Sequence, residues 1–203
     1  MLEYTYENEC RAKGYHNICG IDEAGRGPLA GNVVAAAVIM PEGFLPDGLN
    51  DSKKLTPKRR EALYDVITKN TVWAVGEASP AEIDELNILN ATMLAMHRAV
   101  AALGEKADFA LIDGNCSRGF DIPTRTIVGG DGKSPSVAAA SIIAKVTRDR
   151  ECEELDKKYP TYNFAKHKGY PTKEHMQKVI ELGPCPEHRR SFLSFTSRSD
   201  EEK

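Results

Sequence analysis

The sequence predicts an α/β fold in which helices flank a mixed sheet of five strands. Short apolar runs with β-forming residues alternate with helical segments that have clear start signals. The first two runs follow each other directly and a third comes after a helix. This order suggests an antiparallel half joined to a half with crossovers. The chain has 203 residues, enough for one large domain or a domain with a small appendage.

The strands are predicted from apolar, β-rich composition. In chain order they are Ile18–Ile21, Val33–Met40, Val72–Val75, Phe109–Ile112 and Thr124–Val128. Each predicted helix begins at a hydroxyl side chain that can cap its first turn. The helices are expected to begin after Thr56, Ser79, Ser134 and Thr172, and to end near Asn70, Leu103, Lys158 and Gly183. We expect residues 1–158 to form the core and residues 159–203 to form a basic, helical C-terminal subdomain with a short disordered tail.

The composition, with 41% hydrophobic and 28% charged residues, is typical of a soluble globular protein. The longest apolar run is far shorter than the roughly 20 residues that a membrane span needs. The N-terminus has no apolar signal region, so we expect a cytoplasmic protein. Five scattered cysteines without a C-x-x-C pair indicate reduced thiols rather than a zinc site or disulfides. No self-association motif is evident, and a monomer is expected.

Positive charge is concentrated near the C-terminus, although the formal net charge is −3. Residues 157–198 contain nine Lys and Arg against three Glu, together with six of the fourteen aromatic residues. This combination suits contact with phosphates and with sugar or base faces. The alternative explanation is a solvated surface with a few core aromatics. We expect His167 and His175 to contact phosphate or solvent rather than a metal.

Acidic residues stand at the ends of two predicted strands. Asp22 and Glu23 follow the first strand, Asp113 follows the fourth, and Asp131 lies in a glycine-rich loop before a helix. If the two strands are parallel neighbours, Asp22 and Asp113 meet at the edge where ligand sites of α/β sheets lie. Each aspartate alone is explained as well by a turn or a helix cap.

Clustered carboxylates repel one another and normally require a cation between them. Ligands that are all oxygen select hard ions such as Mg²⁺ or Mn²⁺. Two such ions can activate a water and stabilise the leaving oxygen when a phosphodiester is cleaved. The acids therefore predict a metal-dependent site for phosphoryl chemistry.

The glycine-rich stretch after Glu23 has a competing interpretation. Gly25-Arg26-Gly27-Pro28-Leu29-Ala30 fits the dinucleotide-binding pattern G-x-G-x-x-A. That pattern must open a helix whose N-terminus binds the pyrophosphate. Here it leads into the apolar run Val33–Met40, which is predicted to be a strand, so dinucleotide binding is disfavoured.

The sequence resembles ribonuclease HII in segments that span Ile18 to Phe192 and follow the family's order. The segments are Gly20–Gly31, Asn50–Leu55, Asn87–Thr92, Asp113–Asn115, Asp131 with Ala138–Asp149, and His167–Thr172. The resemblance implies a ribonuclease H-like mixed five-stranded sheet with a two-metal site. It implies an endonuclease that hydrolyses the RNA strand of RNA–DNA hybrids. It also implies nicking of DNA 5′ of embedded ribonucleotides, as in ribonucleotide excision repair, with 3′-hydroxyl and 5′-phosphate ends.

The resemblance also assigns roles to residues. Asp22, Glu23, Asp113 and Asp131 match the family's catalytic, metal-binding carboxylates. Substrate contacts are implied for the phosphate-binding and 2′-hydroxyl-recognising loop, for a lysine that approaches a backbone phosphate, and for a tyrosine that stacks on the sugar at an RNA–DNA junction. These residues are Gly25, Arg26, Gly27, Lys53 and Tyr170. Pro171 departs from the family pattern, which usually has glycine after the tyrosine.

Two other functions fit the fold class. The first is another two-metal nuclease or a transposase-like enzyme, since a fold alone does not fix the substrate. The second is a non-enzymatic binder of RNA–DNA hybrids with one structural ion, against which the four intact carboxylates argue. Among secondary residues, Trp73 and the small residues 138–141 are expected in the core. Lys145 is equally well interpreted as a counter-charge to the acids or as unrelated to them.

Overall fold

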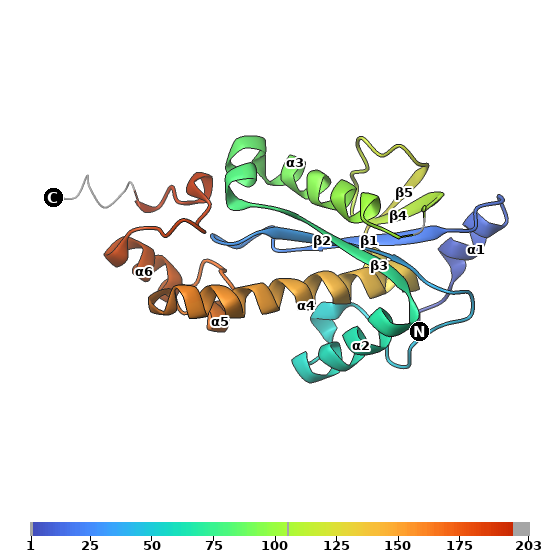
Figure 1. Cartoon of the computed structure of the whole chain (residues 1–203), viewed down its shortest axis with the longest axis horizontal. Coiled ribbons are helices and arrows are strands. Elements are labelled where there is room, and N and C mark those ends of the chain that lie inside the picture. The colour runs from blue at the N-terminus through green and yellow to red at the C-terminus, as the bar shows by residue number, and fades with distance from the viewer. Residues whose placement is uncertain (1, 105, 197–203) are drawn as a thin grey trace.

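The computed structural model describes residues 2–104 and 106–196, in which a mixed five-stranded sheet lies between layers of helices (Figure 1). The strand order is β3-β2-β1-β4-β5. β1 and β2 pair antiparallel, as do β2 and β3, whereas β4 is parallel to both β1 and β5. The strands are β1 (Ile18–Ala24), β2 (Val33–Ile39), β3 (Val72–Ala78), β4 (Phe109–Asp113) and β5 (Thr124–Ile127). The predicted antiparallel half and crossover half are confirmed.

Two long helices cover the two faces of the sheet (Figure 1). α3 (Pro80–Ala101) covers one face, α4 (Pro135–Lys158) covers the other, and α2 (Pro57–Asn70) packs against α4. The predicted helix starts are confirmed, because the side chains of Thr56, Ser79, Ser134 and Thr172 each accept a hydrogen bond from the backbone of the first turn. The remaining helices are α1 (Thr5–Arg11), α5 (Phe164–His167) and α6 (Lys173–Leu182).

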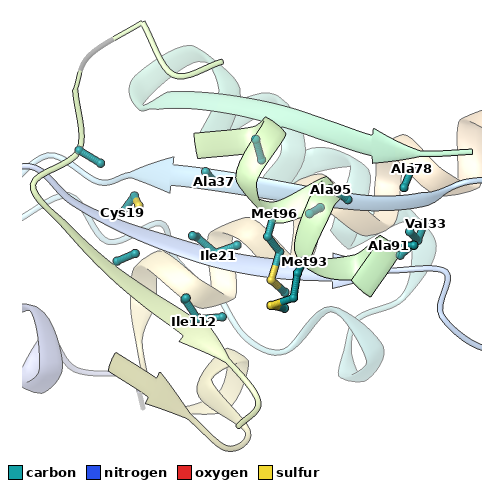
Figure 2. Packing of buried hydrophobic residues seen from close by; sticks show 14 of the residues in the cluster. Cys19, Ile21, Val33, Ala37, Ala78, Ala91, Met93, Ala95, Met96 and Ile112 are labelled. Carbon is teal, nitrogen blue, oxygen red and sulfur yellow. The ribbon is translucent and has the colours of Figure 1, made fainter. Parts of the chain in front are cut away.

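The core beneath α3 is built from small and medium side chains. Figure 2 shows Ile21, Ala37 and Ile112 of the strands packed against Met93 and Met96 of the helix. On the opposite face α4 lies directly on β1. A Cβ atom at Gly20 would stand 2.1 Å from the Ser136 carbonyl carbon. This close approach aligns the next turns of α4 with the end of β1, where the first predicted acids lie.

The other predicted core residues differ in burial. Residues 138–141 are buried between α4 and the sheet, as predicted. Trp73 packs against the same layer but is only partly buried, and its indole N–H donates to the Thr68 carbonyl. All five cysteines are free thiols, as predicted. No helix in the described part of the chain is long and apolar enough to cross a membrane.

α3 differs from its prediction as one continuous helix ending at Leu103. Asn87 has φ 66° and ψ 162°, which interrupts the helix, and the last helical residue is Ala101. The Asn87 side chain accepts hydrogen bonds from Leu89 N (3.0 Å) and Asn90 N (3.2 Å). It therefore caps a second helical segment, which explains an asparagine inside an otherwise helical pattern.

The C-terminal residues pack on the far end of α4, which extends beyond the sheet (Figure 1). Their buried cluster includes Tyr162, Phe164 and Val179, together with Leu29 and Ala30 from the loop after β1. The expectation for His167 and His175 was wrong. Both are buried, and their ring nitrogens have hydrogen-bond partners inside the protein that offset the loss of water. The division of the chain at residue 158 stays a prediction, and the predicted tail, residues 199–203, lies outside the described residues.

Candidate active site at the carboxyl edge of the sheet

Asp22 and Asp113 lie side by side at one edge of the sheet. β1 and β4 are parallel with Ile21 opposite Ile112, so each aspartate is the next residue on its strand. Gly130 N donates to the Asp113 carboxylate (2.7 Å), which fixes the 3-10 turn η2 (Gly130–Gly132) beside it. Asp131, the centre of that turn, is thereby held next to Asp113. The structure thus brings together acids from three separate segments.

Asp22 is the most enclosed of these acids, with only 4% of its surface exposed. It accepts a hydrogen bond from Glu23 N (2.7 Å) and another from the side chain of Ser141 on α4. Ser141 Oγ also lies within hydrogen-bond distance of Ser52 Oγ (2.7 Å), which links the site to the 3-10 turn η1 (Ser52–Lys54). Burial, and then the charges of Glu23 and Asp113, raise the pKa of Asp22 well above its usual range.

The neighbouring acids experience the same two effects. Burial raises the pKa of Glu23, although Arg26, whose Nη1 lies 3.4 Å from Glu23 Oε1, opposes the shift. Burial, followed by the charges of Asp51 and Asp113, raises the pKa of Asp131. Ionised together, these carboxylates would repel one another in a partly desolvated space, so the site favours a cation or a proton.

Lys53 is a basic side chain on which the charges of the acids act. Burial alone would lower its pKa, but the charges of Asp22, Asp131, Asp51 and Asp113 raise it above the usual value. The sequence did not decide whether Lys145 is a counter-charge to the four acids. In the structure Lys145 forms an ion pair with Asp149 instead (2.6 Å). Lys53 is thus placed to respond to the charge state of the cluster.

The donor set fits hard divalent ions, because the clustered groups are all carboxylates. Within residues 2–104 and 106–196, no three His, Cys, Asp or Glu side chains already form a metal cage. Mg²⁺ commonly keeps several waters and takes only one or two protein carboxylates together with substrate phosphate oxygens. An open set of acids at a sheet edge is compatible with that mode of binding.

The loop formed by residues 25–32 is held from inside the protein by Arg189. This fully buried side chain donates six hydrogen bonds of 2.6–3.1 Å, all to main-chain carbonyl oxygens of the loop. The acceptors belong to Gly25, Arg26, Pro28, Gly31 and Asn32. Burial, and then the nearby charge of Arg148, lower the pKa of Arg189 to about 9. The loop conformation is therefore fixed over a buried cationic group.

Arg148 of α4 is the second buried arginine beneath this loop. It donates to the Ala30 carbonyl (2.8 Å), and a Cβ atom at Gly25 would stand 2.5 Å from its Nε. Gly25 also has φ +95°, so glycine is required there for both reasons. Sequence reasoning missed Arg148 and Arg189. The only signal for Arg189 was the basic character of its region.

Tyr170 lies against the same loop. A Cβ atom at Gly27 would be 3.5 Å from the Tyr170 ring, and 46% of the tyrosine surface is exposed. Leu29 N donates to the Gly169 carbonyl (2.8 Å), which ties the two segments together. Pro171 is accommodated in a tight turn in which Thr172 N donates to the Tyr170 carbonyl (2.8 Å).

One cleft of about 390 Å³ joins these features. Asp22 and Glu23 line it, whereas Asp113, next to Asp22, and Asp131, next to Asp113, are not part of its lining. The cleft is also lined by all the predicted substrate contacts, namely Gly25, Arg26, Gly27, Lys53 and Tyr170. Acids that favour a cation, a loop over buried positive charge and an exposed aromatic ring thus share one concave surface. That combination suits a charged, sugar-containing polymer.

The chain is similar to known proteins over nearly its whole length. The model of the Ribonuclease HII family matches residues 19–195. A ribonuclease HII from Ruegeria pomeroyi is 53% identical over 191 residues, which cover 94% of this chain and 82% of that protein. The crystal structure of ribonuclease H2 from Pyrococcus horikoshii OT3 superposes with a TM-score of 0.74 at 30% identity, covering 91% of this chain and 97% of that one.

A more distant structure, Bst-RNase HIII in complex with Mn²⁺, shares the fold with a TM-score of 0.68 at 18% identity. It covers 94% of this chain and 72% of that one. The dinucleotide-binding alternative is wrong, because the glycine-rich stretch leads into β2 and not into a helix. The chain belongs to the ribonuclease HII family and is an endoribonuclease with a ribonuclease H fold.

Proposed function

We propose that this enzyme hydrolyses the RNA strand of RNA–DNA hybrids and nicks DNA 5′ of embedded ribonucleotides, leaving 3′-hydroxyl and 5′-phosphate ends. The observation that carries the proposal is the shared cleft, in which Asp22 and Glu23 face the loop at Arg26 and the ring of Tyr170. We further propose that the enzyme works in the cytoplasm as a monomer and serves ribonucleotide excision repair.

The catalytic and metal-binding roles are assigned to Asp22, Glu23, Asp113 and Asp131. Mg²⁺ or Mn²⁺, when bound in a two-metal arrangement, supplies an activated water and neutralises charge on the phosphate. The raised pKa values of Asp22, Glu23 and Asp131 support this assignment, since they mark buried acids whose charge Arg26 and Lys53 only partly offset. Ser141 and Gly130 N orient Asp22 and Asp113 through hydrogen bonds.

Phosphate binding and 2′-hydroxyl recognition are assigned to Gly25, Arg26 and Gly27. Half of the Arg26 side chain is exposed, so its guanidinium can reach a phosphate in the cleft. The charge of Arg189 beneath the loop favours an anion above it. Lys53 is assigned to a backbone phosphate, and its place among the acids gives it a second role as a counter-charge before substrate binds.

Tyr170 is assigned to the sugar that follows the ribonucleotide. An aromatic ring packs closely on a deoxyribose, whereas the 2′-hydroxyl of a ribose would intrude on that contact. The ring lies over Gly27, where no side chain separates it from the loop. This position supports recognition of an RNA-to-DNA junction, which an enzyme specific for DNA alone does not need.

The test is cleavage of three duplexes: DNA with one ribonucleotide, a uniform RNA–DNA hybrid, and DNA alone. With Mg²⁺ or Mn²⁺ we expect cutting of the first two, with 3′-hydroxyl and 5′-phosphate ends, and none of the third. Ca²⁺ should support binding but little turnover, because its looser coordination does not hold water and phosphate in line. Comparable cutting of the all-DNA duplex would favour a general nuclease, and binding without cutting under every condition would favour a hybrid-binding protein.

The loop assignment has its own test. Arg26→Ala should lower kcat/KM on both cleaved substrates by about a hundredfold, since it removes a charge-assisted contact to phosphate. Arg118→Ala is a matched control, because Arg118 is exposed and does not line the cleft. An Arg26→Ala enzyme that cuts both substrates at the wild-type rate would remove Arg26 from the site.

A further inference from the structure

Three buried histidines lie directly behind Tyr170. His167, His175 and His188 are 8%, 0% and 2% exposed. The rings of His167 and His175 are stacked with centroids 4.2 Å apart, and Phe164 packs edge-on against both. None of the three lines the cleft, so the catalytic assignment gives them no role.

Their hydrogen bonds fix which ring nitrogen carries the proton. Cys185 N donates to His188 Nδ1 (3.0 Å), so His188 carries its proton on Nε2. That proton is directed at His175 Nε2, 3.0 Å away, which must accept it. His175 therefore carries its proton on Nδ1 and donates it to the Tyr170 carbonyl oxygen at 3.0 Å. The result is a one-way chain of donors, the histidine relay, that ends on the backbone of Tyr170.

His167 fixes the residue before Tyr170 by the same logic. Gly169 N donates to His167 Nδ1 (3.1 Å), and His167 Nε2–H donates to the Tyr162 carbonyl (2.8 Å). Gly169 is itself pressed against the loop, because a Cβ atom there would stand 2.9 Å from the Ala30 carbonyl oxygen. The polypeptide on both sides of the Tyr170 ring is thus held by histidines.

We propose that His175 and His188 are positioning residues for the RNA–DNA junction: the relay holds the Tyr170 main chain so that the ring stays over Gly27. The inference rests on the proposed role of Tyr170. The Tyr170 carbonyl has one other donor among the described residues, the main-chain Thr172 N (2.8 Å). His175 therefore supplies the only side-chain donor that the described residues direct at this carbonyl.

The proposal requires both rings to be neutral. A second proton on His175 would face the Nε2–H of His188, and one on His188 Nδ1 would face Cys185 N–H. Burial lowers the pKa of both His175 and His188, in agreement with the neutral state. The relay is therefore intact near neutral pH without any carboxylate partner.

Two substitutions at His175 separate positioning from packing. In His175→Asn the amide nitrogen stands near the position of Nδ1 and can still donate to the Tyr170 carbonyl. In His175→Gln the amide stands near Nε2 and cannot. The measurement is the ratio of kcat/KM for DNA with one ribonucleotide to kcat/KM for a uniform hybrid, which has no junction. We expect His175→Gln to lower this ratio about fivefold and His175→Asn to change it less than about twofold.

General loss of stability moves both substrates together and leaves the ratio unchanged. His16→Gln, at an exposed histidine ahead of β1, is the matched control and should leave the ratio at the wild-type value. In a Tyr170→Ala background, His175→Gln should cause no further drop, because the two act through one contact. Equal ratios for the Asn and Gln variants would overturn the proposal.

The same assay distinguishes this failure from failure of the proposed function. If Tyr170→Ala leaves the ratio unchanged, Tyr170 does not read the junction and the proposed function needs revision. If Tyr170→Ala lowers the ratio but His175→Gln does not, only the relay is refuted. Should the His175 variants fail to fold, ¹⁵N NMR of the wild-type rings decides. Protons on His175 Nδ1 and His188 Nε2 support the relay, and the opposite tautomer of either overturns it.

Discussion

The carboxyl edge of the sheet and the underside of the loop at residues 25–32 both contain buried charge, but they differ in how that charge is compensated. At the edge, Asp22 is almost fully buried and the charges of other acids, Glu23 and Asp113, raise its pKa. Beneath the loop, Arg189 is fully buried as well, but six hydrogen bonds to carbonyl oxygens satisfy it. The first region is incomplete without a ligand, whereas the second is complete in itself.

This difference separates chemistry from support. A buried charge with a full set of hydrogen bonds fixes local structure. A buried carboxylate among like charges is destabilising until a cation or proton arrives, so it persists only where the rest of the fold holds it. This contrast supports the proposal that the acids form the reaction centre. It likewise supports the proposal that Arg189 and the histidine relay hold the recognition elements in place.

The largest expected effect is at the acidic edge. Asp113→Asn replaces a proposed metal ligand with a neutral group of nearly the same shape. Cleavage of both substrates in Mg²⁺ should fall by at least about a thousandfold. In metal-free buffer the same variant should unfold at an equal or higher temperature, because one repelling charge is gone. The measurements are kcat/KM and thermal unfolding with and without Mg²⁺.

Asp121→Asn is the matched control, since Asp121 is exposed in the loop between β4 and β5. It should retain normal activity. Near-normal cleavage by Asp113→Asn would show that Asp113 is not part of the site. The contrast between an acidic reaction centre and a supporting loop would then fail.

The next effect is at Arg189. Arg189 donates through its three side-chain nitrogens to five carbonyl groups. Arg189→Lys keeps the charge but has only one nitrogen, which can donate at most three hydrogen bonds. At least two buried carbonyl groups lose their partner, so the free energy of unfolding should fall by roughly 3 kcal/mol. Arg190→Lys, at the exposed next residue, should cost almost nothing. Equal stability of the two variants in urea denaturation would mean that charge alone holds the loop.

A third effect tests the neutral histidines. The pKa of His188 is lowered from 6.5 to about 4, first by burial and then by His175. Between these values the unfolded chain binds a proton that the folded chain excludes, so stability falls as pH drops below 6.5. From pH 7 to pH 5 the loss should be roughly 2 kcal/mol. The acids with raised pKa values act in the opposite direction.

The His188 contribution is therefore read from a variant. His188→Asn retains an acceptor for Cys185 N but cannot titrate. Between pH 7 and pH 5, the free energy of unfolding of this variant should fall by roughly 2 kcal/mol less than that of the wild type. Identical pH profiles for the two proteins would show that His188 is not held neutral.

Local signals explain how much of this molecule the sequence predicts. The capped helix starts and the apolar strands were identified, and two strands ending in aspartate were enough to predict the acidic edge. The missed features depend on distant partners. Glu7 of α1 is buried because Ser134 Oγ (2.7 Å) and Ser136 Oγ (2.6 Å), more than 120 residues away, donate to its carboxylate. A seven-residue helix held by such contacts gives almost no periodic pattern.

The basic C-terminal region also contains features that the sequence could not predict, because they depend on buried partners. Its charge and aromatic content predicted a nucleic-acid surface, yet His175, His188 and Arg189 point inward. Polar side chains are buried only where partners await them. Apart from the contact between His175 and His188, those partners are main-chain carbonyl and N–H groups, which no sequence pattern marks. Composition therefore predicted that this region binds nucleic acid, but it wrongly placed His167 and His175 on the surface.

The smallest expected effect is at Tyr170. It is also the most direct test of whether Arg189 and the histidine relay support substrate recognition. Stacking of a ring on the sugar is worth roughly 1–3 kcal/mol, so Tyr170→Ala should slow cutting at a single ribonucleotide by about tenfold or more. Cutting of a uniform hybrid should change much less, because it contains no junction. Tyr170→Phe keeps the ring over Gly27 and loses only the hydroxyl, so its ratio of kcat/KM on the two substrates should stay within about twofold of the wild type. If Phe and Ala lower the ratio equally, the hydroxyl and not the ring reads the junction. If neither lowers it, Tyr170 is a packed surface residue, and the support from Arg189 and the histidine relay serves the fold rather than recognition.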